Sequence, residues 1–301
     1  MSNRAETAGP HARVVDVELL RGWPMPVHDD GDKFARGTVV VIGGSPRTPG
    51  AARLAGEAAL RMGAGRLEIV TAADVAVALG VAVPEALVVP LPTGPDDGLC
   101  WTADDDRLHR LIEGADAVLI GPGLLGERVG DVVGGALRWV ADDALVVLDA
   151  QALAALAEVE PDAIPRGRLI LTPNHQELRG LAETATDADI DADDGECALA
   201  AAVARRYGAV VTCFGHVTSP ERCWEVRVGS PGLGTSGSGD VLAGLALGAA
   251  ARCRDAAQAA CWATFVHAEA GVSLASRVGE LSFLARELAG EVPAVLGAIE
   301  A

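Results

Sequence analysis

Short apolar runs alternate with helical patterns along most of the chain, and this alternation restricts the fold more than any other feature of the sequence. Each run spans three to five residues and ends in a turn rich in glycine, proline or polar residues. Such runs are typical of strands buried on both faces of a parallel sheet. They lie at 38–42, 67–71, 117–120, 145–148, 169–171 and 209–212, with helical patterns between them, for example at 51–62, 196–207 and 241–251. The sequence therefore predicts an α/β fold with a doubly wound, mostly parallel central sheet flanked by helices.

The first 32 residues differ from the rest because they are polar and contain several prolines and an acidic pair at Asp29 and Asp30. We expect them to form an N-terminal arm that does not begin the core. From residue 33 onward no linker or internal repeat interrupts the alternation, so residues 33–301 are predicted to form a single α/β domain. Hydrophobic residues make up 50% of the chain, which is enough for a substantial core.

Charge and cysteine usage exclude several classes of partner. The formal net charge is −18, which makes binding to nucleic acid or to an anionic membrane unfavourable, so we expect neither partner. The six cysteines are scattered without a C-x-x-C pair, a pattern typical of reduced thiols in a cytoplasmic protein. No apolar run reaches the length that spans a membrane, and we therefore expect a cytoplasmic location.

The glycine-rich tract at 234–240 leads directly into an apolar helical pattern. A helix that starts after such a turn exposes backbone N–H groups at its positive end, which predicts a phosphate site at Gly237, Ser238 and Gly239. Asp240 lies in the first turn, where the helix dipole should keep its carboxylate ionised and able to accept a proton from a substrate hydroxyl. The residues alone leave a second interpretation open, in which the tract is a flexible turn and Asp240 is a helix cap.

A second glycine-containing junction, at 43–51, joins a predicted strand to a predicted helix. Its spacing is not that of the dinucleotide-binding fingerprint. The glycines would allow a ligand to approach the backbone closely, although a simple strand-to-helix loop explains the pattern equally well.

A third stretch, at 172–177, places Asn174 and Glu177 three residues apart, on one face of a helix that begins there. A carboxylate and an amide so placed can hold waters around Mg²⁺, which prefers oxygen ligands, and Glu177 is the candidate for that contact. The same two residues are also typical of a helix-capping arrangement, and both interpretations stay open.

In this order, the segments resemble those of the NAD(P)H-hydrate dehydratase family, within the ribokinase-like superfamily. The resemblance runs from Lys33 to about Gly271, and of its segments only GSGD is specific on its own. The segments are VVVIGGSP (39–46), GAARLAGEAALRMGAG (50–65), IGPGL (120–124), LDAQAL (148–153), LTPNHQEL (171–178), PGLGTSGSGDVLAG (231–244) and FVHAEAG (265–271).

The resemblance implies a ribokinase-like fold and an enzyme that restores NADH or NADPH from its hydrated form. In this family ADP or ATP, with Mg²⁺, phosphorylates the hydroxyl, and phosphate is then eliminated. Asp240 would be the base at the hydroxyl. The implied substrate contacts are Ala51, Gly123, Asn174 and Asp240, and the implied nucleotide contacts are Phe214, Gly215, His216, Val217, Thr218 and Gly239.

The sequence departs from the family pattern in three places. Phe214-Gly215 replaces the usual Lys-Gly, Asn174 replaces the usual histidine with His175 one place later, and Gln151 replaces the second aspartate of Asp-Ala-Asp. Phe214 in particular predicts weakened nucleotide binding.

Two alternatives therefore stay beside the dehydratase. One is a ribokinase-like kinase for a small molecule such as a vitamin precursor or sugar alcohol, and the other is a degenerate member that binds nucleotide without turnover. We also expect a homo-oligomer. Family members are often fused to an epimerase domain, for which this chain has no room, so a separate epimerase is an expected partner.

Overall fold

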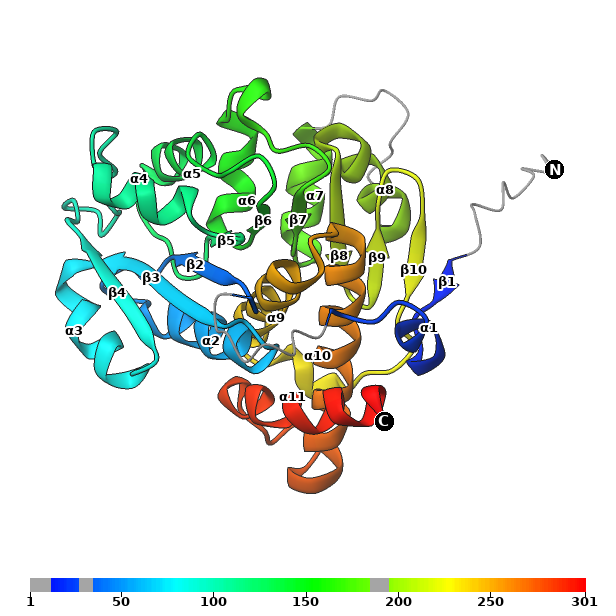
Figure 1. The fold of residues 1–301 in the computed structure, drawn as a ribbon. Helices are drawn as coiled ribbons and strands as arrows, with labels where there is room; N and C mark the ends of the chain where they lie inside the picture. Colours follow the sequence, from blue (N-terminus) through cyan, green and yellow to red (C-terminus); the bar gives the residue numbers. More distant parts are fainter. Residues whose placement is uncertain (1–11, 27–34, 185–194) are drawn as a thin grey trace, which may run out of the picture.

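Ten strands form one sheet in the computed structural model, which describes residues 12–26, 35–184 and 195–301 (Figure 1). Their order is β1-β10-β9-β8-β7-β6-β5-β2-β3-β4. The strands from β8 to β4 in this order run parallel, whereas β9 is antiparallel to both of its neighbours. The bounds are β1 (Arg13–Val14), β2 (Thr38–Ile42), β3 (Arg66–Ala72), β4 (Ala86–Leu91), β5 (Ala117–Ile120), β6 (Leu145–Leu148), β7 (Leu169–Leu171), β8 (Ala209–Cys213), β9 (His216–Thr218) and β10 (Cys223–Glu225).

Helices cover both faces of this sheet and enclose two hydrophobic cores. Alternate residues of one strand enter different cores: Val39 and Val41 lie in the first, Val40 and Ile42 in the second. The first core lies under α1 (Val17–Arg21), α2 (Pro49–Arg61), α9 (Ser238–Cys253), α10 (Ala256–Val278) and α11 (Ala285–Glu300). The second lies under α4 (Asp106–Glu113), α5 (Val129–Leu137), α6 (Gln151–Ala155), α7 (His175–Thr184) and α8 (Glu196–Tyr207). The predicted doubly wound, mostly parallel sheet is confirmed. None of the described helices is both long and apolar enough to cross a membrane.

The predicted apolar runs all correspond to strands, with β3 and β8 slightly longer than expected. The strands that the sequence did not indicate lie at or near the sheet edges. β4 is the edge strand beyond β3, and α3 (Ala73–Ala82) connects the two. β4 is only partly buried and contains Pro90, which an edge strand tolerates because it can leave one ladder hydrogen bond unmade. Its pattern therefore lacks the continuous apolar run of a central strand.

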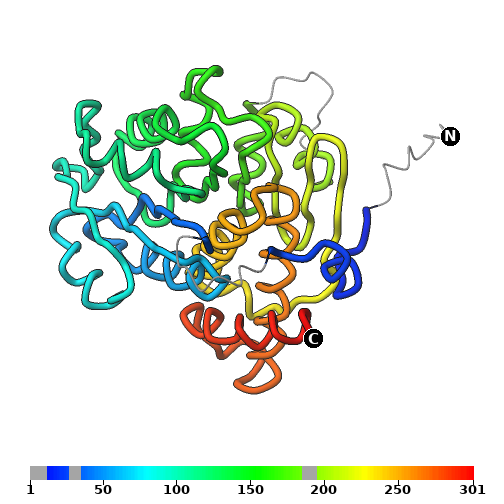
Figure 2. Tube along the Cα trace, in the orientation of Figure 1, coloured from blue at the N-terminus to red at the C-terminus, as the bar shows by residue number. Residues whose placement is uncertain are grey.

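The described part of the expected N-terminal arm, residues 12–26, packs onto the domain. β1 pairs with β10 at the sheet edge, and Leu20 and Met25 are buried in the first core. Arg21 Nε donates to the Ile299 carbonyl at 2.7 Å, which ties this segment to the C-terminal helix (Figure 2). These residues therefore pack on the domain, because apolar side chains among the polar ones supply a buried face, and the division into an arm and a domain stays a prediction. Residues 1–11 and 27–32 of the expected arm lie outside the described residues, and the boundary at residue 33 stays a prediction.

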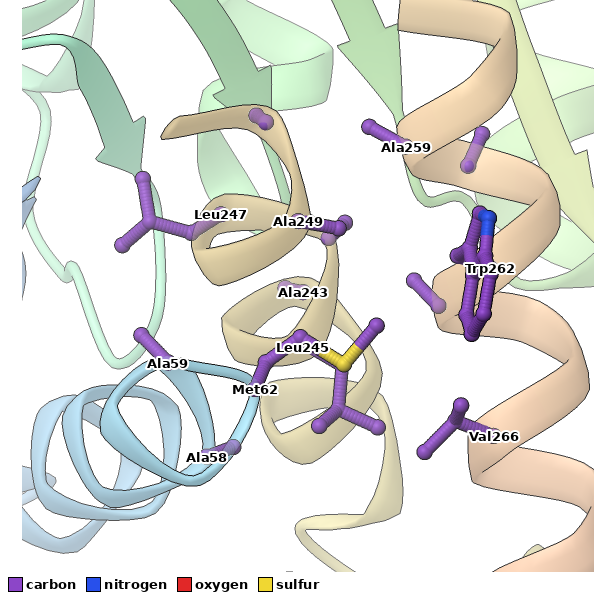
Figure 3. Close-up of a cluster of buried hydrophobic side chains, with 14 of the residues drawn as sticks. Ala58, Ala59, Met62, Ala243, Leu245, Leu247, Ala249, Ala259, Trp262 and Val266 are labelled. Carbon is purple, nitrogen blue, oxygen red and sulfur yellow. The ribbon is translucent and has the colours of Figure 1, made fainter. Parts of the chain in front are cut away.

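Helix α9 lies between α2 and α10, and the three helices pack around Met62, Leu245 and Trp262 (Figure 3). Two glycines of α9 allow α2 to come close. A Cβ atom at Gly244 would lie 2.2 Å from the carbonyl oxygen of Ala55, and one at Gly248 would lie 2.5 Å from that of Ala59. Because the obstructing atoms belong to backbone, they cannot move aside as a flexible side chain would.

We therefore expect Gly248→Val to lower the free energy of unfolding by at least 1–3 kcal/mol, roughly the cost of overpacking a core. Thermal or denaturant unfolding measures this change. Gly134→Ala in α5 is the matched control, because nothing lies within 4 Å of a Cβ atom there. This control should raise stability by roughly 0.5–1 kcal/mol through helix propensity alone. Equal stability of the Gly248→Val variant and wild type would contradict the close packing.

Candidate functional site

The turns that follow β2 and β5 are joined by hydrogen bonds at the carboxyl ends of these adjacent strands. Gly44 N donates to the Pro122 carbonyl at 2.9 Å, and Ser45 N donates to the Gly123 carbonyl at 2.8 Å. The Thr48 hydroxyl donates to the same Gly123 carbonyl at 2.7 Å. Two stretches about 80 residues apart in the sequence thus form one surface, at the edge of the sheet where α/β proteins bind ligands.

The two predicted substrate contacts Ala51 and Gly123 lie side by side on this surface. Gly123 has a φ of +67°, and a Cβ atom there would lie 2.4 Å from the Thr48 carbonyl oxygen and 3.0 Å from the Ala51 Cβ. Only glycine fits this conformation and this contact without strain. The structure therefore brings together these two residues, and the surface between them is built from backbone and a methyl group.

The predicted phosphate tract forms the start of α9. Gly237 is the N-cap residue with a φ of +88°, and a Cβ atom there would lie 2.7 Å from Leu54 Cδ1 of α2. Ser238 is fixed by His267, whose Nε2 lies 2.9 Å from the Ser238 hydroxyl and 3.1 Å from its carbonyl oxygen. A Cβ atom at Gly239 would meet nothing within 4 Å, so the backbone there is open to a ligand.

Asp240 is the third residue of α9 and not its cap. The N-cap position belongs to Gly237, and no side-chain hydrogen bond caps the helix. The capping interpretation of Asp240 is therefore excluded. Burial raises the pKa of Asp240 to about 6, which corrects the expectation that the helix dipole alone would set its ionisation. Desolvation outweighs the dipole here, and the carboxyl group is left with a pKa close to that of an effective general base at neutral pH.

Asp149, which directly follows β6, lies near Asp240 and Glu177. Only 5% of Asp149 is exposed, and it accepts a hydrogen bond from the Thr172 hydroxyl at 2.7 Å. Burial, followed by the charges of Asp240 and Glu177, raises its pKa to about 7. We call Asp149, Glu177 and Asp240 the acidic centre. Asp149 was assigned no role from the sequence. Its position as a polar residue directly after a buried strand could have indicated a site residue.

Asn174 and Glu177 form a reciprocal cap at the start of α7. Asn174 Oδ1 accepts from the backbone N–H groups of Gln176 and Glu177 at 2.9 and 3.0 Å, while Asn174 N donates to Glu177 Oε2 at 2.8 Å. This is the capping arrangement that the sequence left open. The cap also orients the Glu177 carboxylate so that its charge acts on Asp149. A contact of Glu177 with Mg²⁺ stays a prediction.

The predicted nucleotide segment, 214–218, divides into an accessible and an inaccessible part. Phe214 is 60% exposed, in the turn between β8 and β9, and stacks on His175 with ring centroids 3.4 Å apart. Gly215 and His216 are partly exposed beside it. Val217 and Thr218 are buried in β9, which pairs with strands on both sides, and their contact with a nucleotide stays a prediction. The exposed part of this segment is 214–216.

The chain is similar in sequence to known proteins of one family. The family model described as NAD(P)H-hydrate dehydratase matches residues 39–294. An ADP-dependent (S)-NAD(P)H-hydrate dehydratase from Xanthomonas campestris is 43% identical over 96% of this chain and 97% of its own length. Other relatives are described as bifunctional NAD(P)H-hydrate repair enzymes, and the chain spans about half of their length.

Two solved structures share the fold. An ADP/ATP-dependent NAD(P)H-hydrate dehydratase from Bacillus subtilis, co-crystallised with ATP/Mg²⁺, superposes with a TM-score of 0.76 at 25% identity, covering 97% of this chain and all of that one. A ribokinase-like superfamily protein from Enterococcus faecalis superposes with a TM-score of 0.80 at 21% identity, covering 96% of this chain and 97% of that one. The predicted ribokinase-like fold is confirmed.

The raised pKa of Asp149 predicts a pH-dependent stability. Between the ordinary value of 3.8 and about 7, the folded protein holds a proton that the unfolded chain releases, so stability falls as pH rises through this window. Asp149→Asn keeps the acceptor for Thr172 and removes the titration. We expect its melting temperature to exceed that of wild type above pH ~7 and to vary less with pH.

The control for this prediction is Asp162→Asn, at an exposed position, which should leave the profile unchanged. An Asp149→Asn profile as steep as that of wild type would show that Asp149 is not the group that titrates.

Proposed function

The chain belongs to the NAD(P)H-hydrate dehydratase family and is an enzyme, and on this premise we propose that it restores NADH or NADPH from the hydrated nicotinamide with ADP, or ATP, as phosphoryl donor. The names of its relatives from Xanthomonas and Bacillus support this reaction. The Xanthomonas relative also supports the (S) form of the hydrate as substrate and ADP as the donor.

The observation that carries the mechanism is the position of Asp240, one residue after the open backbone of Gly239 at the start of α9. The hydroxyl of the hydrate gives its proton to Asp240, and its oxygen attacks the terminal phosphorus of the nucleotide. The N–H groups at the helix start stabilise the negative charge on the transferring phosphoryl group. The bond from the terminal phosphorus to the bridging oxygen breaks, so ADP leaves as AMP. Phosphate then leaves C6 as a proton leaves the neighbouring ring carbon, and this elimination restores the nicotinamide double bond.

The substrate lies against the joined turns after β2 and β5. Ala51 and Gly123 offer no side chain larger than a methyl group, so a flat ring can approach the backbone closely. Asn174 follows β7 at the same edge of the sheet, where a cap connects it to Glu177. Positioning of this kind contributes most of the catalysis in phosphoryl transfer, where the protein does little covalent chemistry.

The acidic centre fits Mg²⁺. Glu177 and Asp149 supply oxygen atoms, the ligands that Mg²⁺ prefers, and the repulsion that raises the pKa of Asp149 would be relieved by a cation. When bound, Mg²⁺ would neutralise charge on the nucleotide phosphates. The carboxylate of Glu177 would contact it through water, while the reciprocal cap with Asn174 holds that carboxylate in place.

Phe214 offers the nucleotide base an aromatic surface at the edge of the site. Phe214 is exposed and stacks on His175, so a planar adenine can stack on its free face. Phe214 replaces a lysine that would have met phosphate as a point charge. Affinity for ADP should therefore be lower than in relatives that carry Lys-Gly.

We further propose that the enzyme works in the cytoplasm, which fits its six free cysteines. A separate epimerase would convert the other form of the hydrate, as the bifunctional relatives of about twice the length suggest. The homo-oligomer remains a prediction.

Asp240→Asn tests the assignment of the base. Asparagine keeps the size of aspartate and cannot take the proton, so turnover should fall by about 10²–10⁴. ADP binding should persist, and the melting temperature at neutral pH should not fall, because a poorly solvated carboxylate is removed.

Asp131→Asn is the matched control for this variant, because Asp131 is likewise the third residue of its helix, α5, but is exposed. It should leave turnover unchanged. Retained activity in the Asp240→Asn variant would remove the catalytic assignment. A wild-type protein that binds ADP without any turnover would instead favour the degenerate, nucleotide-binding alternative.

Phe214→Lys tests this aromatic surface. The added ammonium should meet phosphate and tighten ADP binding, as measured by calorimetry. Phe214→Ala separates the two contributions, because it removes stacking without adding charge and should weaken binding. A lysine variant that binds ADP no better than wild type would show that 214–216 does not face the phosphates.

A further inference from the structure

A cluster of two cysteines and a histidine lies where α8 meets the hairpin of β9 and β10 (Figure 1). Cys197 is the second residue of α8, His216 begins β9, and Cys223 begins β10. One ligand atom from each residue, two sulfurs and an imidazole nitrogen, lies within 4.8 Å of the other two. The pairing of β9 with β10 brings His216 and Cys223 together, and the packing of α8 on this hairpin adds Cys197 from an earlier part of the chain.

Hydrogen bonding within the fold does not satisfy these side chains. His216 Nδ1 is buried and has no partner, whereas buried polar atoms are nearly always paired. The Cys223 sulfur makes only weak contacts, with the Thr218 hydroxyl at 3.7 Å and the Trp224 carbonyl at 3.8 Å. The cluster therefore has binding capacity that the protein itself does not use.

We propose that Cys197, His216 and Cys223 bind a zinc ion. Two thiolates and an imidazole are a known three-residue ligand set for zinc, which leaves the fourth position to water or another small ligand. Ligand atoms around a tetrahedral zinc lie about 3.5–3.8 Å apart, given Zn–S and Zn–N bonds of about 2.3 and 2.0 Å. From separations of up to 4.8 Å, the sulfur and nitrogen atoms need to close by about 1.3 Å at most. Cys197 is exposed, so the open position faces solvent.

Zinc competes with protons for the same ligand atoms. A cysteine binds zinc as the thiolate, so zinc must displace a proton from each thiol. Binding should therefore release protons and weaken as the pH falls.

The zinc site adjoins the aromatic surface proposed for the nucleotide base. Glu196, next to Cys197, forms an ion pair with His175, and His175 stacks on Phe214. Bound zinc would link the start of α8 to the hairpin of β9 and β10, which follows the turn at 214–215. It would thereby restrain Phe214, an effect that rests on the proposed function, whereas metal binding itself does not.

Cobalt(II) is the probe for this site, because it takes the same ligands as zinc and reports them by absorption. The full-length protein, reduced and freed of metal, is titrated with Co²⁺. We expect one equivalent to bind with a thiolate-to-cobalt charge-transfer band and the intense visible bands of tetrahedral cobalt, and Zn²⁺ to displace it. The melting temperature should rise with zinc, since a ligand that binds only the folded state stabilises it.

Variants assign the ligands. Cys197→Ser is at an exposed position and should fold as wild type, yet it should lose much of the charge-transfer intensity, as should Cys223→Ser. His216→Asn keeps both thiolates, so it should weaken cobalt binding and change the visible bands. Cys100→Ser, at a partly buried cysteine outside the cluster, is the matched control and should keep the full spectrum.

An absent charge-transfer band, or an unchanged one in Cys197→Ser, would overturn the proposal. So would a reduced protein that binds no cobalt while mild oxidation links Cys197 to Cys223, since the pair would then be a disulfide site. These results depend on no substrate, so failure here leaves the proposed dehydratase activity untouched.

Discussion

Close contact between backbones at glycine positions is the constraint on which the rest of this structure depends. A Cβ atom at Gly121 would lie 1.8 Å from the carbonyl oxygen of Asp149, and one at Gly43 would lie 2.2 Å from that of Pro122. These contacts hold the turns after β2, β5 and β6 side by side. Gly244 does the same for helices, because it lets α9 rest on the backbone of α2 at Ala55. The start of α9 is thereby brought to the same edge of the sheet as the three turns.

This arrangement brings the three carboxyl groups of the acidic centre together at a site that is partly shielded from water. Asp149, Glu177 and Asp240 come from different elements; Asp149 is buried, whereas Glu177 and Asp240 are partly buried. The cost appears as raised pKa values for Asp149 and Asp240. Such a site favours a cation, or a ligand that can give a proton to a carboxylate. In the proposed reaction Mg²⁺ is the cation and the substrate hydroxyl gives the proton. Perturbed carboxyl groups of this kind are typical of catalytic sites.

The sequence predicted the central sheet because its strands are buried on both faces and so read as continuous apolar runs. β4 escaped prediction because an edge strand can carry Pro90 and partly exposed residues, and β9 and β10 because three-residue strands leave almost no pattern. The first turn of α9 was predicted correctly, since a glycine-rich tract before an apolar helix has few other uses. The raised pKa of Asp240 was not predicted, because burial depends on packing that no local pattern records.

Groups assembled from distant segments were the hardest to foresee. Asp149 stands alone after β6, and its partners Thr172 and Asp240 lie in other parts of the chain. Cys197, His216 and Cys223 show no metal-binding spacing, because α8 and the hairpin supply them separately. Conversely, Val217 and Thr218 lie in the predicted nucleotide segment, but both belong to β9, which lies between two neighbouring strands, and both are buried.

Coupling of a nucleotide to the repair of a hydrated nicotinamide can be measured directly. The wild-type protein is incubated with the (S) form of NADH hydrate, ADP and Mg²⁺, and the absorbance of reduced nicotinamide is followed over time. NADH should appear together with equal amounts of AMP and phosphate, and omission of ADP and ATP should abolish its formation. Accumulation of a phosphorylated hydrate without NADH would indicate a kinase, and the absence of any turnover with either nucleotide would contradict the dehydratase activity.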